Sequence, residues 1–475
     1  MFSYKLKILK HRTLWLFILF VLASPLITPY LRGDGIGYYS YVASLITDGD
    51  LWFEDEYRHA DPWHYHNYFD EQGHLKAHLY TKTGHIHNKF STGPSILWIP
   101  FFGVAHIIAK YTHLFPADGF LLPYRYLCAF GTALYGFIGL FLAFKVARDI
   151  TGEWEAFWAT IGIWFASALP VYMYFLPFMS HAHSVFICSL FVWFWWRTYR
   201  HLTDRRIWEW GVLGFLLGFA FSTYYVNLLL GLFVAIDLVE VLRRSPKPFP
   251  QLLGATGAFL GGLFLGWLPT GVVKWIIFGS PFRFGYTERW FFFNPRLWQV
   301  LFASEHGLWA WTPLILLACI GFIPLIRRCP PIGWRCVGTF LIFWYVIASF
   351  QNWHGQSSFS NRFFLSLTPL FVLGFSALLK EIREKTTSRP KLRTLVPICI
   401  LLLSLWNWGF IFQWGTNMIP NRGPISWSVM IRNQFTEVPI RVLQIARGFI
   451  TDRMSIMKEI EKQDVEEIKK YRVRR

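Results

Sequence analysis

The residues best suited to chemistry lie between Arg32 and Glu56, a stretch that opens with Arg-Gly-Asp-Gly-Ile-Gly. Asp34 follows the first apolar run, Leu14 to Leu31, so it is expected at the boundary between lipid and water. A carboxylate at that depth is costly to hold and points to a function. Glycines at positions 33, 35 and 37 would let the backbone turn sharply beside it. These features make Asp34 the leading candidate for a catalytic residue.

Three basic residues are candidates for binding an anion. Lys89 precedes Gly93-Pro94, which opens an apolar helix, and the free amide groups of a helix start favour an anion such as phosphate. A lysine at the membrane surface also snorkels toward headgroups, so both readings stay open. Arg289 and Arg362 fall in connections on the same side of the membrane as Lys89. Several cations at one depth indicate an anionic lipid headgroup.

Histidine and glutamate residues in these connections are candidates for contacting substrate. They are His181 and His183 in Ser-His-Ala-His, Glu288 beside Arg289, and His354 before a polar turn of small residues. Seven of the 15 histidines lie between His59 and His87, and His74 and His78 have the spacing of a metal-binding pair on a helix. Nothing in the sequence fixes such a geometry. The sequence therefore requires no metal or other cofactor, while a divalent metal remains compatible with it.

Composition assigns the chain to the membrane proteins. It has 475 residues, 54% of them hydrophobic, and repeated apolar runs long enough to cross a hydrocarbon core of about 30 Å. The net charge of +18 could indicate nucleic acid, but Lys and Arg fall largely in short connections between apolar runs, where they set topology. We therefore expect membrane lipids and no nucleic acid as partners. The six cysteines are scattered and form no disulfide framework.

Placing the basic connections in the cytoplasm predicts eleven transmembrane helices. They lie near 14–31, 121–146, 153–176, 183–198, 208–222, 225–243, 251–278, 308–326, 334–350, 362–380 and 393–414. The run Pro94 to Lys110 is also apolar, but counting it as a full span would place the next two basic connections outside the cytoplasm. It is therefore predicted as a re-entrant or interfacial helix. The pair 208–222 and 225–243 could instead be one kinked helix. The expected fold is an all-α polytopic membrane bundle with a large first outer loop, about 32–120.

Two regions follow from this layout: a transmembrane domain over 1–415 and an extramembrane tail over 416–475. In the tail, apolar residues recur at helical spacing from Leu443 to Ile460, which favours an amphipathic helix on the membrane over a partner-binding helix. The spans carry almost no charge at mid-depth, whereas ion-coupled transporters usually need ionisable groups there. The polar residues gather instead at the outer side, which favours surface chemistry.

Four short motifs together resemble the polytopic GT-C glycosyltransferases over residues 1 to about 415. They are Asp34-Gly35 after the first span, Asn88-Lys-Phe-Ser-Thr-Gly-Pro94, Ser180-His-Ala-His183, and Asn361-Arg-Phe363 ahead of Thr368-Pro369. The pattern is most similar to bacterial relatives of the protein O-mannosyltransferases and of the lipid A aminoarabinose transferase. Many relatives carry an acidic residue in the second outer loop, where this chain has His181 and His183. That departure leaves metal use and a second acidic role open.

The resemblance implies an enzyme that takes a sugar from a polyprenyl-phosphate donor at the outer face of a bacterial cytoplasmic membrane. It assigns Asp34 as general base and Lys89, with Arg362, to the donor phosphate. The acceptor would be a lipid, a glycan or a protein. The alternatives are a flippase or transporter of lipid-linked oligosaccharides and an oligosaccharide polymerase or ligase.

Overall fold

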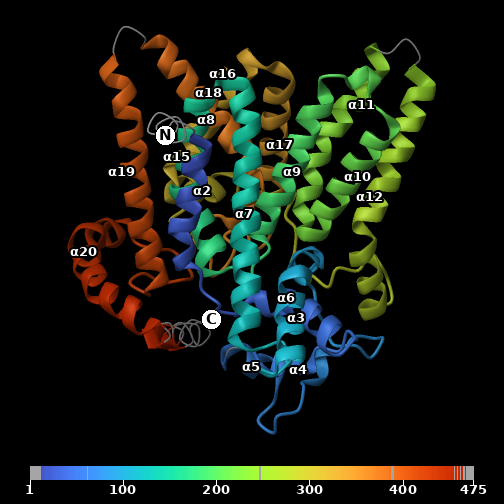
Figure 1. Ribbon diagram of the computed structural model, residues 1–475, viewed down its shortest axis with the longest axis vertical. Coiled ribbons are helices and arrows are strands. Elements are labelled where there is room, and N and C mark those ends of the chain that lie inside the picture. Colours follow the sequence, from blue (N-terminus) through green and yellow to red (C-terminus); the bar gives the residue numbers. More distant parts are fainter. Residues whose placement is uncertain are drawn as a thin grey trace.

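The chain forms an almost entirely helical bundle in the computed structural model, which describes residues 12–60, 62–244, 248–386, 390–453, 455, 456, 458–460, 462, 463 and 466. Within these residues β structure is limited to isolated bridges such as Phe69 with Leu75. Figure 1 shows the long helices side by side along the longest axis, with α3, α4, α5 and α6 gathered at one end. We call this the Asp34 end, since α3 begins at Asp34.

The helices of the bundle correspond to the predicted spans. They are α2 (Arg12–Ala23), α7 (Leu122–Thr151), α8 (Glu153–Phe165), α9 (His181–Tyr199), α10 (Ile207–Thr223), α11 (Leu232–Arg244), α12 (Pro248–Phe278), α15 (Pro313–Ile320), α16 (Phe322–Arg328), α17 (Pro330–Ser349), α18 (Thr368–Lys385) and α19 (Pro390–Gly415). The remaining α-helices are α3 (Asp34–Thr47), α4 (Glu54–Arg58), α5 (Pro62–Tyr68), α6 (Gly93–Thr112), α13 (Leu297–Phe302), α14 (Leu308–Trp311) and α20 (Trp427–Thr451).

The prediction of an all-α polytopic membrane protein is confirmed. Seven helical segments of the described chain are long and apolar enough to cross a membrane by length and composition. The spans predicted at 208–222 and 225–243 are separate helical segments. The backbone is extended at Tyr224, where α10 ends, and the second segment consists of η5 (Tyr225–Gly231) followed by α11. One of the seven is α6, which was predicted as a re-entrant or interfacial helix; it packs on α3 and α7 at the Asp34 end.

Prolines account for three departures from the predicted spans, because proline lacks the backbone N–H that an α-helix needs. The first span ends early, with α2 followed by the 3-10 turn η1 (Ser24–Leu26), which contains Pro25. The span predicted at 153–176 is interrupted after α8, and a π-helical turn, η3 (Val171–Phe175), follows Pro170. The span predicted at 308–326 is divided among α14, α15 and α16, and α15 begins at Pro313.

Close packing of α10 on α12 depends on two Gly-xxx-Gly pairs. Gly214 and Gly218 lie on α10, and Gly262 and Gly266 lie on α12. A Cβ at any of these four positions would overlap a backbone carbonyl oxygen of the facing helix, such as that of Phe259 opposite Gly214. Small residues that let two backbones approach are a common basis of helix association in lipid.

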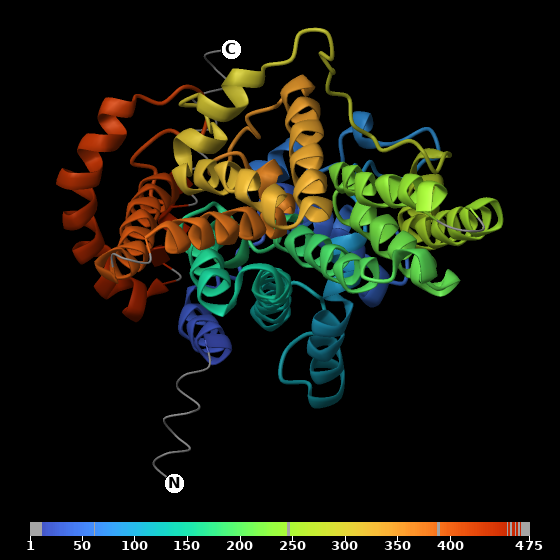
Figure 2. The ribbon, with the colours of Figure 1, turned by 90° about the horizontal axis from the view of Figure 1, so that it is seen from above.

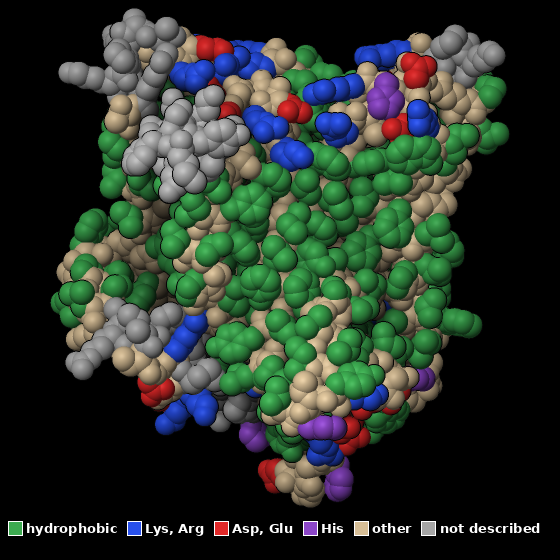
Figure 3. All heavy atoms as spheres, viewed as in Figure 1, with side chains coloured by type: hydrophobic (Ala, Val, Ile, Leu, Met, Phe, Trp, Pro, Cys, Tyr) green, Lys and Arg blue, Asp and Glu red, His purple; other side chains and the backbone are tan. Residues whose placement is uncertain are grey.

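The opposite end of the bundle carries most of the connections rich in Lys and Arg, as the upper edge of Figure 3 shows. A buried ion cluster joins helices there: the Asp237 carboxylate on α11 accepts from Arg205 at 2.8 Å and from Arg335 of α17 at 2.6 Å. Both guanidinium groups are buried, so the pairing offsets a large desolvation cost. The cluster is a structural feature, remote in the chain from every predicted site residue.

The tail contains α20, which packs on α19 and lies at the edge of the molecule in Figures 1 and 2. Ile431, Phe435 and Leu443 on α20 are exposed. Met454 and Met457, which belong to the stripe predicted between Leu443 and Ile460, lie outside the described residues. The division near residue 415 and the interfacial location of the tail stay predictions.

Candidate active site

Asp34 is the first residue of α3, a short helix that is buried from Gly35 to Ser44. Gly33 caps this helix with φ of 61°, a left-handed conformation that strains any residue with a Cβ. The turn predicted from the glycines therefore exists, and it places the carboxylate at a helix N-terminus, where a negative charge is stabilised. The Asp34 side chain is 39% exposed, so solvent or a ligand can reach it.

Arg362 forms an ion pair with Asp34. Its Nη2 donates to Asp34 Oδ2 at 2.9 Å, across 328 positions of sequence. Arg362 opens η6 (Arg362–Leu367), the 3-10 turn that leads into α18, and its side chain is only 12% exposed. Of the two side chains, that of Asp34 is therefore the more accessible to solvent. Two residues predicted independently as base and phosphate ligand are thus in direct contact.

Tyrosine hydroxyls surround this ion pair. Tyr38 and Tyr172 are buried and Tyr224 is partly buried, and each interacts electrostatically with both Asp34 and Arg362. The Tyr38 hydroxyl donates to Ser180 at 3.2 Å, and burial raises the pKa of this α3 phenol, which is therefore neutral at physiological pH. Sequence reasoning missed all three residues, because a chain with 21 Tyr offers no signal that singles them out.

The two histidines of the Ser-His-Ala-His corner have different surroundings. The His181 ring lies 4.8 Å from the ring of Tyr172 and 5.6 Å from that of Tyr224, so it belongs to the Asp34 cluster. Its Nδ1 is buried and forms no hydrogen bond with the described residues. His183 is fully buried and packs edge-on against Trp98 of α6 at 5.0 Å, so it is part of the helix core.

The segment from Asn88 to Pro94 packs directly on α3 and α10. Asn88 Nδ2 donates to the carbonyl oxygen of Gly37 at 2.8 Å, one turn after Asp34. Ser91 donates to Thr223 of α10 at 3.0 Å, and a Cβ on Gly93 would overlap the end of the same helix. Asn88, Ser91 and Gly93 thus have structural roles, whereas the Lys89 side chain stays 33% exposed.

Lys89 lies beside a residue of the later outer loop. Its Nζ is 3.3 Å from Glu288 Oε1 and 5.0 Å from the ring centre of Tyr286. Tyr286 also interacts electrostatically with Asp34, which links Lys89 to the same cluster. The pair of Lys89 with Glu288, both predicted site residues, brings the connections 32–120 and 279–307 together.

Lys274 is a site residue that sequence reasoning overlooked. This lysine of α12 is fully buried, and its Nζ donates to the carbonyl oxygens of Asn88 at 2.8 Å and Phe90 at 2.7 Å. A longer contact of 3.3 Å reaches the Tyr41 hydroxyl. No carboxylate among the described residues forms an ion pair with it. The Lys274 amino group, bound to backbone carbonyls on both sides of Lys89, fixes the backbone that carries the Lys89 side chain.

His354 and Arg289 contact residues of other connections. His354 Nδ1 is 3.4 Å from Glu305 Oε1 and accepts from the amide of Gln356 at 3.0 Å. The Arg289 amide donates to the side-chain Oε1 of Gln351 at 2.9 Å, and the Gln351 amide donates to the Arg289 carbonyl oxygen at 3.0 Å. The Arg289 side chain is exposed. Their predicted substrate and phosphate roles stay predictions.

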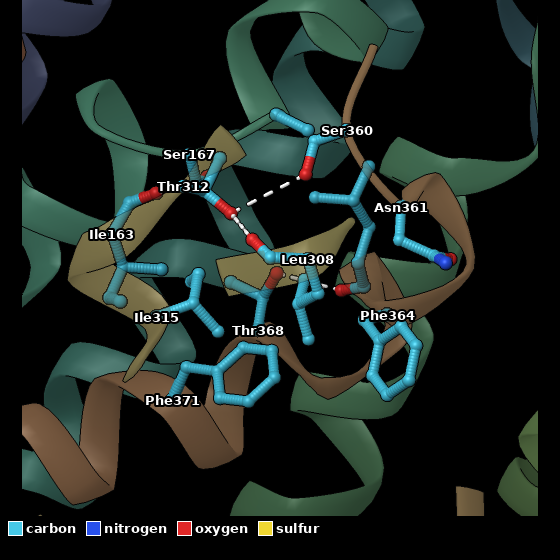
Figure 4. A pocket seen from close by; sticks show the side chains of 12 residues that line it. Ile163, Ser167, Leu308, Thr312, Ile315, Ser360, Asn361, Phe364, Thr368 and Phe371 are labelled. Atoms are coloured by element: carbon cyan, nitrogen blue, oxygen red, sulfur yellow. Dashed lines mark hydrogen bonds between the residues drawn. The ribbon is translucent and has the colours of Figure 1, made fainter. Parts of the chain in front are cut away.

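The polar turn before Arg362 encloses a small cavity. Figure 4 shows Ser167, Thr312, Ser360 and Asn361 among the apolar side chains that line it. Its volume of about 10 Å³ is close to the minimum for a single water molecule. Asn361 is fixed there by a 3.0 Å bond from Nδ2 to the Trp353 carbonyl. This cavity is a packing feature behind the site and is too small for a sugar.

Glu56 is unusual among the acidic residues that follow Asp34. It lies on α4, is 2% exposed, and neither of its carboxylate oxygens has a hydrogen-bond partner. Burial raises its pKa from 4.5 to about 8, with smaller contributions from the carboxylates of Asp48, Asp55 and Asp50. Across the described residues, no three His, Cys, Asp or Glu side chains are grouped so that they would hold a metal ion.

Comparison with known proteins gives a structural likeness. No family model matches the chain, and no curated protein matches it in sequence. The crystal structure of ArnT from Cupriavidus metallidurans in the apo state matches over 96% of this chain and 74% of that chain, with a TM-score of 0.50 and 11% sequence identity. This chain has an ArnT-like fold. The resemblance predicted from four short motifs is thus supported at the level of the fold.

Proposed function

We propose that this protein is an integral-membrane glycosyltransferase that moves a sugar from a polyprenyl-phosphate-linked donor to an acceptor. The contact of Arg362 with Asp34 at 2.9 Å carries the proposal. It joins a base and a phosphate-binding cation in one cluster, as this reaction requires. The ArnT-like fold supports the reaction class, and the aminoarabinose transferase activity of that neighbour favours a lipid acceptor over a glycan or protein.

In the proposed reaction, Asp34 removes the proton from an acceptor hydroxyl as its oxygen attacks the anomeric carbon of the sugar. The bond from that carbon to the phosphate oxygen breaks, and polyprenyl phosphate leaves with the electron pair. Attack from the face opposite the phosphate inverts the anomeric centre. Arg362 would turn from Asp34 toward the phosphate, which frees the carboxylate to accept the proton. Lys89 would neutralise the charge that develops on the leaving group.

One carboxylate is sufficient for this chemistry. Hydrolysis of an ordinary glycoside generally takes two carboxylic groups, one of which protonates a poor leaving oxygen. A lipid phosphate leaves as a stable anion and needs cations in place of an acid. General-base catalysis contributes about 10² to 10⁴ in rate, and positioning with electrostatic stabilisation would supply the rest. His181, with its unpartnered buried Nδ1, is placed to orient a sugar or acceptor hydroxyl.

The orientation in the membrane follows from charge. The Asp34 end is opposite the end rich in Lys and Arg, and cytoplasmic connections carry an excess of these residues. We therefore propose that the site faces the outer side of a bacterial cytoplasmic membrane. The polyprenyl chain of the donor would lie along the apolar helix surfaces below the cluster.

The test is to supply the purified protein with synthetic polyprenyl-phosphate sugars and membrane extract as the acceptor source, then to measure free polyprenyl phosphate by mass spectrometry. Release that depends on extract and yields a glycosylated product is the expected result. Movement of intact donor across vesicles without bond cleavage would contradict the proposal and favour a flippase. Products extended by many sugars would point to a polymerase. Parallel reactions with and without EDTA would establish whether a divalent metal takes part.

A further inference from the structure

The connection between α12 and α13, residues 279–296, exposes an unusual number of aromatic side chains; we call it the aromatic loop. Phe282, Trp290, Phe291, Phe292 and Phe293 are all exposed, and Phe293 is fully so. Trp298, two residues further on, is 69% exposed. Transfer of apolar side chains out of water is favourable. A patch of this kind marks a surface that is covered by something other than water.

The aromatic loop is held firmly at both ends, so its exposed side chains are a fixed surface. At its start, the ring of Phe282 stacks on Trp267 of α12, with 5.3 Å between ring centres. Toward its end, the amide of Phe291 donates to Ser349 at 2.6 Å, and the Tyr345 hydroxyl of α17 donates to the Phe292 carbonyl at 2.8 Å. Figure 2 shows this segment, in yellow, extending beyond the edge of the helix bundle.

The anchors also fix the depth of the aromatic loop. Both α12 and α17 belong to the segments long and apolar enough to span a membrane, and the loop joins their ends on the Asp34 side. Side chains that extend sideways from the ends of spanning helices meet the headgroup region of the bilayer. Tryptophan and other amphipathic aromatic rings are enriched at that level in membrane proteins.

Charge identifies the covering partner. Arg283, Arg289 and Arg296 of the aromatic loop are exposed, and its one carboxylate, Glu288, is 3.3 Å from Lys89. The accessible charge is therefore positive and interspersed with aromatic rings. This combination suits a layer of lipid phosphates above hydrocarbon, because arginine pairs with phosphate while the rings enter the apolar region below.

We infer that the aromatic loop is a membrane-insertion element that places Phe292, Phe293 and Trp298 among the lipids of the outer leaflet and binds their phosphates through its three arginines. The partner is the phospholipid bilayer itself, and Arg289 contacts bulk lipid phosphate in this arrangement. The inference does not depend on the proposed reaction. Tyr286 and Glu288 of the same loop contact Lys89, so the element would also hold the site against the membrane surface.

The test uses a fluorescent label at Phe293→Cys in a Cys399→Ser background, because Cys399 is exposed in the native chain. The labelled protein is reconstituted in vesicles of phosphatidylcholine with phosphatidylglycerol. Quenching by a nitroxide on the lipid acyl chain is compared with quenching by aqueous iodide. A label at Glu71→Cys, in an exposed turn of the first outer loop, is the aqueous control, and the background variant alone gives the signal from the other cysteines.

We expect the lipid nitroxide to quench the Phe293→Cys label several-fold more than iodide does, and the Glu71→Cys label to show the reverse. Trp298→Cys should behave as Phe293→Cys does, which guards against a failure of one variant to fold. Replacing the three arginines by Gln should weaken the lipid quenching. Iodide quenching of both loop labels equal to that of Glu71→Cys would overturn the inference. Protection from both quenchers would overturn it in favour of a protein partner.

Discussion

Replacement of Lys274 by Met tests whether this buried lysine positions Lys89. The substitution keeps an unbranched side chain of similar length but removes the hydrogen bonds of 2.7 and 2.8 Å to the carbonyls of Phe90 and Asn88. An intramolecular hydrogen bond contributes about 0.5 to 1.5 kcal/mol, so the two bonds together contribute about 2 kcal/mol. The Tyr41 hydroxyl, 2.9 Å from the Phe90 carbonyl, can satisfy one of the two acceptors.

The variant is expected to lose about 2 kcal/mol of free energy that keeps the Lys89 segment in place. If that loss appears in donor binding, the affinity for the donor falls roughly 30-fold. The assay is sugar transfer at varied donor concentration, where the KM for donor should rise by roughly that factor while kcat falls less. Thermal unfolding of the detergent-solubilised protein shows whether the variant remains folded.

A double-mutant cycle separates positioning from general destabilisation. If Lys274 acts through Lys89, the variant with Lys274→Met and Lys89→Ala should be little worse than Lys89→Ala alone, because the group being positioned is already absent. Fully additive losses in donor KM would refute the positioning role. So would an unchanged donor KM in a folded Lys274→Met variant.

Three further predictions concern the site and its supports. Since burial raises the pKa of Glu56 to about 8, the folded state binds this proton more tightly than the unfolded state does, and that stability is lost as the pH rises from 4.5 toward 8. Glu56→Gln should therefore raise the unfolding temperature near pH 9, by an amount worth at most about 4 kcal/mol, and change little near pH 5; equal effects at both pH values would contradict this. Gly37→Ala should lower both stability and the rate of sugar transfer, because its Cβ would overlap the Phe90 ring. Gly49 lies in open space but has φ of 75°, so Gly49→Ala should lower only stability, by about 1 kcal/mol. Gly266→Val should separate α10 from α12 and reduce the folded yield in membranes, which a normal yield would refute.

The bundle was predictable because membrane burial requires long apolar runs, and those runs are explicit in the sequence. The helix positions from α7 to α19 follow from this constraint together with the basic connections. The breaks at Pro25, Pro170 and Pro313 were foreseeable locally, since proline interrupts helices. The span prediction gave more weight to hydropathy than to these residues.

The sequence singled out some charged residues of the candidate site but none of its contacts. Asp34, Lys89 and Arg362 were distinguished by residue type and by location at helix boundaries. Their pairing was not readable, because Asp34 and Arg362 are 328 positions apart and only the folded bundle sets their distance. Lys274 lacked any signal, since a lysine near a helix end usually reaches outward to water. Here it points inward to two carbonyls, which is a property of the tertiary structure.

The roles of His181 and His183 illustrate the same limit. The two residues share a motif and differ by two positions, which on a helix places their side chains on different faces. His181 therefore joins the tyrosines around Asp34, while His183 packs against Trp98. A motif can identify the corner but cannot tell which of its histidines faces the site.

The most direct test of the central claim is to measure donor binding and sugar transfer for Asp34→Asn in the same preparation. Asparagine keeps the size of the side chain and removes its capacity to accept a proton at neutral pH. The account predicts that the dissociation constant for the polyprenyl-phosphate donor changes by no more than about tenfold while the transfer rate falls by at least about 10². Asp48→Asn, a nearby exposed carboxylate, should retain both properties. Transfer by folded Asp34→Asn at a rate near that of the wild type would contradict the assignment of Asp34 as the base.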